Sequence, residues 1–272
     1  MTVIAMTREM GSLGKEVARL AADRLGLTIV NHEMIGSADE RANATTSAVA
    51  RFLETGPGPE DKRNGGISHG GYLTPSEILE LASRGQVLIR GWGAARLLRE
   101  VPHILTVRVC APLERRVEEM CRRLGVDAAT AKREIERSDA EHAQAFLRFF
   151  STDWRRPTNY DMVLNTNHLS VESCADILVD AARSVTLAET PESRRVLEDK
   201  LLEARIDERL HGATPFGRRA SYVQSSVEGG RVRLYGAVSD TSTAREIEAM
   251  VRELPGVAAL ESQIARVPIY GN

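Results

Sequence analysis

Lysine, cysteine and aromatic residues are scarce in this chain of 272 residues, and it has no apolar run long enough to cross a bilayer. The three cysteines are widely spaced, which argues against a disulfide framework and against C-x-x-C zinc ligation. Neither sign of charge is in excess, since 36 basic residues accompany 38 acidic ones, so binding to nucleic acid or to an anionic membrane through bulk charge is not expected. The histidines lack zinc-ligand spacing, and no resident metal is expected. The amino-terminal segment has no signal-like pattern, and we expect a cytoplasmic protein.

The composition is otherwise that of an ordinary globular protein, with 42% hydrophobic and 27% charged residues. Up to about residue 186, short apolar segments alternate with amphipathic helical patterns. This alternation predicts an α/β fold with a parallel sheet covered by helices on both faces. One helix begins with a capping box, in which Thr74 precedes Pro75 and Glu77. The expected strands are residues 3–6, 27–30, 86–89, 104–110 and 162–165, and the clearest helices are residues 15–25 and 74–83.

The order of the expected helices and strands changes after a boundary at residues 189–194. There the pattern predicts a small α+β domain, because a helix is followed by a hairpin, a second helix and a last strand. We therefore expect a first domain at 1–188, a linker at 189–194 and a second domain at 195–268. Turn-forming residues at 56–71 make a long connection, typical of a functional loop or of disorder. The expected elements of the second domain are helices 194–210 and 243–254 and strands 220–227, 231–238 and 260–267.

The segment T-R-E-M-G-S-L-G-K-E, residues 7–16, lies between the first strand and the first long helix. Glycines in such a loop let backbone N–H groups converge on phosphate oxygens, and a lysine reaches the terminal phosphates. The motif G-x-x-x-x-G-K-[ST] is incomplete here, because Glu9 stands in place of its first glycine and Glu16 in place of the hydroxyl residue that normally touches magnesium. An alternative is that Gly11 and Gly14 only form a turn and that Lys15 is a solvated residue.

Two observations favour an anion at this loop. Lysine is rare in the chain, since only four of the 36 basic residues are lysines. A cation in the first helical turn also opposes the helix dipole unless an anion is bound there.

The same segment resembles the start of the cytidylate kinase-like family, whose members open with a strand, S-R-E-x-G-S-G-G and an amphipathic helix. The similarity continues through V-L-I-R-G-W-G-A-A-R-L-L and I-L-T-V-R-V-C-A-P-L-E-R-R-V, and it ends with D-W-R-R-P-T-N-Y-D-M-V-L-N-T. It covers about the first 185 residues. The resemblance implies a P-loop kinase fold, with ATP and Mg²⁺ as cofactors, and transfer of the γ-phosphoryl group to a nucleoside monophosphate such as CMP.

Carried over to this sequence, the resemblance implies a set of residues that bind ATP and a set of cations that act in catalysis. Several further arginines on the two following helices are individually more typical of a solvated surface. The ATP-binding set is Arg8, Gly11, Ser12, Leu13, Gly14, Lys15 and Glu16, and the catalytic set is Lys15, Arg116 and Arg123.

The acceptor site is expected where this sequence departs from the family pattern. Relatives carry G-R-G or G-R-C after a core strand, whereas this chain has Arg90 followed by Gly-Trp-Gly around Trp92. The family motif D-x-x-R appears as Asp139 and His142, and we expect His142 on the helix surface and mostly neutral at pH 7. Trp92 either packs in the core or covers a nucleobase. These four residues are the predicted acceptor-binding set.

The segment V-E-G-G-R-V-R-L-Y-G-A-V-S-D, a helix and L-P-G-V-A-A-L resemble a BON domain. The resemblance implies a small α+β module that binds a ligand or phospholipid. We interpret it as a cytoplasmic sensory or oligomerising appendage that binds a small ligand or a protein partner and regulates or recruits the kinase domain, and a homo-oligomer is compatible with it. Two alternatives remain to a nucleoside monophosphate kinase. One is a nucleotide-binding sensor or scaffold that has lost turnover and acts through the BON domain, and the other is a kinase for a different small molecule.

Overall fold

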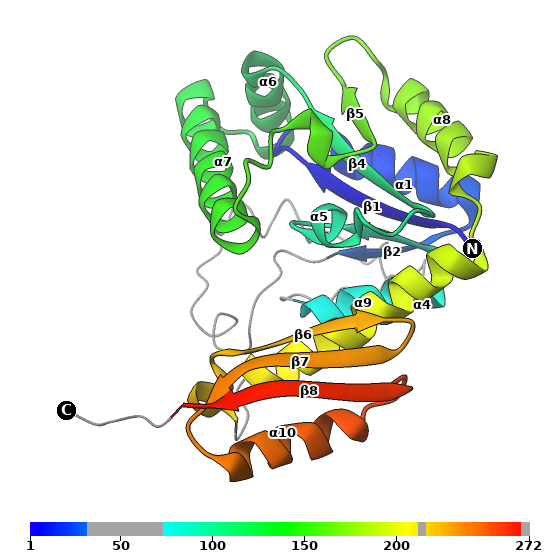
Figure 1. The fold of residues 1–272 in the computed structure, drawn as a ribbon. Helices are drawn as coiled ribbons and strands as arrows, with labels where there is room; N and C mark the ends of the chain where they lie inside the picture. Colours follow the sequence, from blue (N-terminus) through cyan, green and yellow to red (C-terminus); the bar gives the residue numbers. More distant parts are fainter. Residues whose placement is uncertain (32–72, 212–215, 268–272) are drawn as a thin grey trace. The chain divides into compact units, whose positions relative to one another are not determined.

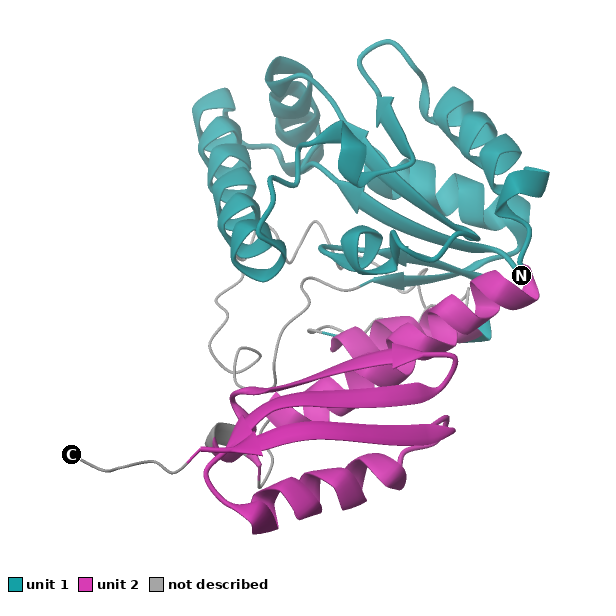
Figure 2. Ribbon diagram, viewed as in Figure 1, with its two compact units in different colours: residues 1–35, 44–73, 84–189 teal, residues 36–43, 74–83, 190–272 magenta. Residues whose placement is uncertain are grey.

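The computed structural model describes residues 1–31, 73–211 and 216–267. Contacts divide the chain into two compact units, which Figure 2 shows in different colours. The first contains residues 1–35, 44–73 and 84–189, and the second contains residues 36–43, 74–83 and 190–272. The predicted loop at 56–71 lies outside the described residues.

A five-stranded parallel sheet with the order β2-β3-β1-β4-β5 forms the centre of the first unit (Figure 1). Val3 of β1 is paired with Val87 of β3 on one side and with Ile104 of β4 on the other. The three central strands are buried on both faces, which explains why they read as nearly continuous apolar runs. The predicted parallel α/β sheet is confirmed. The strands are β1 (Val3–Arg8), β2 (Thr28–Asn31), β3 (Val87–Arg90), β4 (Ile104–Cys110) and β5 (Met162–Asn165).

Helices cover both faces of this sheet. In Figure 1, α1 (Gly14–Leu25) and α8 (Val171–Ala182) lie on one face, and the short α5 (Ala94–Leu98) lies on the other. Two longer helices, α6 (Leu113–Leu124) and α7 (Ala128–Phe150), follow β4, and short 3₁₀ turns η2 (Pro157–Asn159) and η3 (Val185–Leu187) complete the unit.

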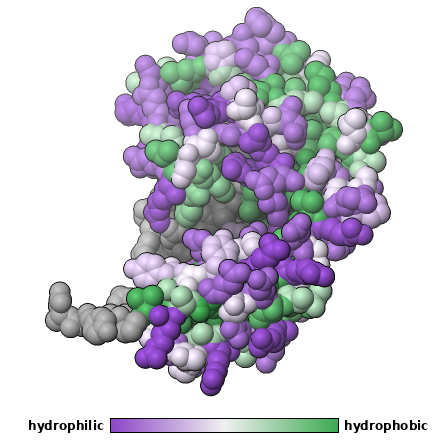
Figure 3. Space-filling view, viewed as in Figure 1, coloured by the Kyte–Doolittle hydropathy of each residue, from purple (hydrophilic) through white to green (hydrophobic). Residues whose placement is uncertain are grey.

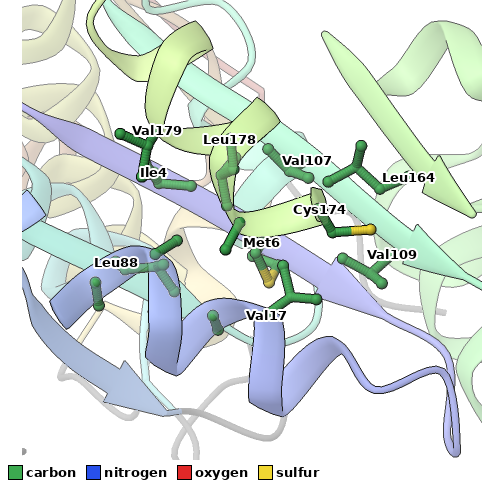
Figure 4. Packing of buried hydrophobic residues seen from close by; sticks show 14 of the residues in the cluster. Ile4, Met6, Val17, Leu88, Val107, Val109, Leu164, Cys174, Leu178 and Val179 are labelled. Atoms are coloured by element: carbon green, nitrogen blue, oxygen red, sulfur yellow. The ribbon is translucent and has the colours of Figure 1, made fainter. Parts of the chain in front are cut away.

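The core of the first unit lies between the sheet and the pair α1 and α8. Figure 4 shows Met6 of β1, Val17 of α1 and Leu178 of α8 meeting there, together with Val107 and Val109 of β4. Each of these side chains is fully buried. This core fixes the start of α1 against the end of β1, and so it positions the loop between them.

The second unit is built on a three-stranded sheet with the order β6-β7-β8. β6 and β7 form the predicted antiparallel hairpin, and β8 is parallel to β7. Alternate residues of β7, such as Val232 and Leu234, are buried against the helices, while Arg231 and Arg233 are exposed. The elements are α4 (Pro75–Arg84), α9 (Pro191–His211), η4 (Gly217–Ala220), β6 (Val223–Glu228), β7 (Arg231–Val238), α10 (Thr241–Arg252) and β8 (Ala259–Arg266).

Helix α4 belongs to the second unit although its sequence lies inside the predicted first domain. Its capping box is confirmed, because Thr74 N–H donates to Glu77 at 2.7 Å and Glu77 N–H donates to Thr74 Oγ1 at 3.3 Å. The backbone N–H and hydroxyl of Ser76 donate to Glu208 of α9, at 2.9 and 2.6 Å. The unit also includes part of the predicted linker, since α9 begins at Pro191.

The face of the protein seen in Figure 3 is largely hydrophilic, with smaller hydrophobic areas between the polar side chains. Within the described ranges, the structure contains no helix that is long and apolar enough to cross a membrane.

Two neighbouring residues of α8 test the packing of the first unit. Leu178 is fully buried, whereas Ile177 is 39% exposed. We expect Leu178→Ala to lower the free energy of unfolding by about 2–5 kcal/mol, because the substitution leaves a cavity in a packed core. Urea unfolding would measure the loss, with Ile177→Ala as the matched control. Equal losses in the two variants would contradict the packing described here.

Candidate functional site

The candidate site lies at the carboxyl ends of β1 and β4, the two neighbouring strands at the centre of the sheet. The chain leaves β1 toward one edge of the sheet, through α1 to β2, and it leaves β4 toward the other edge, through α6 and α7 to β5. Ligands of open α/β sheets bind in the crevice that such diverging connections open. The loop between β1 and α1, residues 9–13, lies at this switch point.

The loop has an unusual backbone. Gly11 has φ 79°, and a Cβ at this position would lie 2.7 Å from the backbone oxygen of Arg116, so only glycine fits there without a shift. Leu13 has φ 58° in the left-handed region, which costs about 1–2 kcal/mol for a residue with a Cβ. Leu13 also occupies the N-cap of α1, where its side chain cannot accept a hydrogen bond. A bound anion can supply the acceptor that this helix start lacks.

A pocket opens at this loop. Three of its side chains are cationic, and they are Arg8, Lys15 and Arg123. The lining also holds three carboxylates, and the three cations with the start of a 12-residue helix are the groups suited to bind phosphate. The full lining is Arg8, Glu9, Met10, Gly11, Ser12, Leu13, Gly14, Lys15, Glu16, Glu119, Met120 and Arg123, so the structure brings together every predicted ATP-binding residue.

Glu9 connects the loop to β4. It is 8% exposed, and one carboxylate oxygen accepts a hydrogen bond from Arg108 of β4 at 2.5 Å. The other oxygen accepts from Ala111 N–H at 3.2 Å and lies 3.5 Å from the guanidinium of Arg116. A buried carboxylate requires such partners, because its desolvation is costly. The glutamate that interrupts the sequence motif therefore anchors the loop to the sheet.

Arg116 is committed to the same network. Its Nε donates to the backbone oxygen of Met10 at 2.7 Å, and its two terminal nitrogens donate to Asp139 of α7 at 2.8 and 2.9 Å. Only 4% of the residue is exposed, and it does not line the pocket. Of the predicted catalytic cations, Lys15 and Arg123 thus lie at the pocket, while Arg116 and Asp139 hold the loop in place.

The pocket-facing part of α6 carries its own ion pairs. Arg123 lies 3.4 Å from an oxygen of Glu16, and Arg122 binds Glu119 through two hydrogen bonds at 2.6 and 2.9 Å. The side chain of Arg122 is largely exposed to solvent in this pair. Arg123 is the arginine of this helix that contributes charge to the pocket.

Trp92 and His142 face each other and are not among the residues that line this pocket. Their rings are stacked with an interplanar angle of 25°, and Trp92 also packs against Trp154 and Phe146. The expectation that His142 lies on the helix surface is wrong, because the ring is partly buried against Trp92. Burial, followed by the charges of Arg8 and Arg116, holds the pKa of His142 well below its ordinary value.

The remaining predicted acceptor residue, Arg90, ends β3 and is 3% exposed. Trp92, the next aromatic residue, is 8% exposed, which agrees with its packing alternative. A contact between either residue and an acceptor stays a prediction.

Two residues of the site are absent from the sequence prediction. Arg108 binds Glu9, donates to the backbone oxygen of Arg155 at 2.6 Å and lies 4.8 Å from the ring centre of Trp154. Thr166 follows β5, and its hydroxyl donates to the backbone oxygen of Ser12 at 2.9 Å. An arginine in the mostly apolar strand I-L-T-V-R-V-C is a signal for a buried partner. No comparable signal marks Thr166.

The ion pair between Asp139 and Arg116 should carry more stability than a surface pair on the same helix. Asp139→Asn is expected to cost about 3–5 kcal/mol of unfolding free energy, because Arg116 loses its bidentate partner in a mostly buried position. Glu136→Gln is the control, since the pair of Glu136 with Lys132 is exposed and should cost less than about 1 kcal/mol. Urea unfolding would measure the free energy of unfolding of both variants. A decrease in Asp139→Asn that is no larger than in Glu136→Gln would refute the described ion-pair network.

The depressed pKa of His142 predicts a pH dependence of stability. Below the unfolded-state pKa of about 6.5, the unfolded chain binds the proton more readily than the folded chain. The free energy of unfolding should therefore fall as the pH decreases from 6.5 toward the lower folded pKa. His142→Phe should remove part of this fall, and His168→Phe, at an exposed position, should not. Unfolding at pH 8, 6 and 5 would measure it, and an unchanged slope in His142→Phe would contradict the assignment.

Comparisons with known proteins show what this chain is similar to. A cytidylate kinase of Pyrobaculum aerophilum is 26% identical over 181 residues, which are 66% of this chain and 92% of that protein. A cytidylate kinase of Aeropyrum pernix is 33% identical over 105 residues, 39% of this chain and 60% of the relative. An uncharacterized protein from Eubacterium ventriosum has a solved structure that matches with a TM-score of 0.49 and 16% identity, over 68% of this chain and 99% of that one. The model of the cytidylate kinase-like family matches residues 3–168, more than half of the chain. The chain belongs to the cytidylate kinase-like family.

Proposed function

We propose that the first unit binds ATP at the loop between β1 and α1 and transfers its γ-phosphoryl group to a nucleoside monophosphate, with CMP as the first candidate. The carrying observation is the pocket in which Lys15, Arg8 and Arg123 surround the start of α1. Membership of the cytidylate kinase-like family supports a kinase that uses a nucleotide. The relative from Pyrobaculum aerophilum, named a cytidylate kinase and matched over 92% of its length, supports CMP as acceptor.

The pocket suits the electrostatic demands of this reaction. Charge spreads over the transferred phosphoryl group in the transition state, and catalysis consists mainly of positioning and of neutralising that charge. In our proposal the first turn of α1 holds the β-phosphate, while Lys15 and Arg123 neutralise the γ-phosphoryl group. Arg116 acts indirectly, because its bonds to Met10 and Asp139 fix the loop that carries Lys15.

For the acceptor, we propose a site at the carboxyl end of β3. Arg90 would supply a permanent charge for the acceptor phosphate, and Trp92 with His142 would form an apolar wall beside it. Neutral imidazole suits such a wall, and the low pKa of His142 keeps the ring neutral at pH 7.

For the second unit we propose a BON-like regulatory or recruiting role. The segments that carry the resemblance form the hairpin of β6 and β7, followed by α10 and β8, and this small α+β arrangement supports the proposal. The turn of the hairpin is held by Asp199 of α9, which accepts hydrogen bonds from Gly229 and Gly230 N–H at 2.7 and 2.8 Å.

One observation favours a second candidate function, a nucleotide sensor without turnover. Arg116 is paired with Asp139 and does not line the pocket, so one of the expected catalytic cations does not face the proposed ATP site. In this alternative the first unit binds ATP and the second unit carries the output.

Substitution of Lys15 separates these functions. With MgATP and CMP, dCMP, UMP or AMP in a coupled assay, we expect turnover by the wild type and a loss of at least about a hundredfold in Lys15→Ala, because the variant lacks a transition-state cation. Lys132→Ala is the matched control, since Lys132 lies exposed on α7. Nucleotide binding without turnover would favour the sensor. Turnover that survives undiminished in Lys15→Ala would refute the role of Lys15, and no nucleotide binding at all would refute the proposed kinase.

A further inference from the structure

A carboxylate directly after the phosphate-binding lysine needs an explanation. Glu16 lies in the first turn of α1 and lines the pocket beside Lys15. Phosphates bound in this pocket would repel the carboxylate of Glu16, because both groups are anionic and would lie in the same pocket. A divalent cation between Glu16 and the phosphates would turn this repulsion into attraction.

The pocket offers few other groups to such a cation. Within the described lining, Ser12 has the only hydroxyl, and this group donates to the backbone oxygens of Glu9 and Val109, at 2.8 and 3.2 Å. Ser12 is 1% exposed, and its hydroxyl is directed into the protein by these bonds. The position that normally carries a magnesium-binding hydroxyl is the position of Glu16.

The two other carboxylates of the pocket are engaged. Glu9 is shared by Arg108, Ala111 and Arg116. Glu119 accepts two hydrogen bonds from Arg122. Within the part of the chain that the structure describes, no group of three or more His, Cys, Asp or Glu side chains could hold a metal ion without a ligand's help.

Of the three carboxylates that line the pocket, Glu16 is the one with an oxygen that accepts no hydrogen bond from the described residues. Its Oε1 lies 3.4 Å from Arg123, while its Oε2 is shielded from solvent and has no hydrogen-bond donor among the described residues. Such an atom is costly to bury unless it meets a cation or donor in the working state. Mg²⁺ at nucleotide sites is held by one or two carboxylates together with phosphate oxygens and water, so a single glutamate fits its requirements.

We propose that the carboxylate of Glu16 is the direct protein ligand of the Mg²⁺ that accompanies ATP, in place of the usual hydroxyl. The proposal rests on the proposed function, since it requires ATP at this loop. It also assigns Arg123 a second role, because its contact with Oε1 orients the carboxylate toward the pocket.

The test compares nucleotide affinity with and without the metal, in the full-length protein. Titration calorimetry would measure the binding of a non-hydrolysable ATP analogue in Mg²⁺ and in EDTA, for the wild type, Glu16→Gln and Glu16→Ser. We expect Mg²⁺ to raise the affinity of the wild type at least about tenfold, and Glu16→Gln to lose most of this gain, as a metal site does when its ligand sphere is altered. In EDTA, Glu16→Gln should bind the analogue as well as the wild type or better, because a repulsive charge is gone. Glu16→Ser should recover part of the gain through its hydroxyl.

Glu119→Gln is the matched control, since Glu119 lies in the same pocket but is bound to Arg122. It should keep the full gain from Mg²⁺. Free Mn²⁺, counted by its electron paramagnetic resonance signal with protein and ADP present, gives a second readout, and Glu16→Gln should leave more Mn²⁺ free than the control.

The outcomes separate this proposal from the proposed function. If the analogue binds and Glu16→Gln keeps the gain from Mg²⁺, or the wild type shows no such gain, the role of Glu16 is refuted while ATP binding stands. If the wild type binds the analogue neither with Mg²⁺ nor without it, the proposed function fails, and the metal proposal fails with it.

Discussion

The buried carboxylate of Glu9 is the group on which the geometry of the site depends. It is shared by Arg108 from the central strand β4 and by Arg116 from α6. Without these cations its burial would be prohibitively costly, so the loop, the strand and the helix must meet in an arrangement that pairs all three. Arg116 extends the constraint to α7 through Asp139 and to the loop backbone through Met10. Three elements that follow the loop in sequence, β4, α6 and α7, are held around it by this network.

The network also explains the composition of the pocket. Arg108 and Arg116 are paired inside the protein, and the cations that line the pocket are Arg8, Lys15 and Arg123, at the start of α1. The strained backbone of Leu13 persists because the surrounding contacts determine it, and such strain is typical of binding loops. The loop can thus bind an anion although Glu9 stands in place of the first glycine of the motif. The ion pairs of Glu9 with Arg108 and Arg116 hold the loop backbone in position.

Much of the first unit could be predicted from local patterns. The bounds of β4 and β5 agree with the predicted strands, because apolar runs between turn residues have few alternative structures. The loop after β1 could also be predicted, because Gly11, Gly14 and Lys15 stand between an apolar strand and an amphipathic helix. The role of Arg116 could not be predicted, since its partners Glu9 and Asp139 are distant in sequence and helix spacing indicates only a surface arginine. Likewise, nothing near His142 indicates Trp92 as its neighbour, and the ring was expected in solvent.

The sequence by itself determined the parallel sheet, the loop after β1 and the change in the order of helices and strands before α9, because these follow from periodicity, capping and turn residues within a few positions. Only the tertiary structure decided which arginines reach the pocket, that α4 packs with α9 through Glu208, and that Glu16 has an oxygen without a donor. Charged side chains are long and can pair with any partner that the fold brings near, so their roles depend on contacts between segments that sequence spacing does not encode.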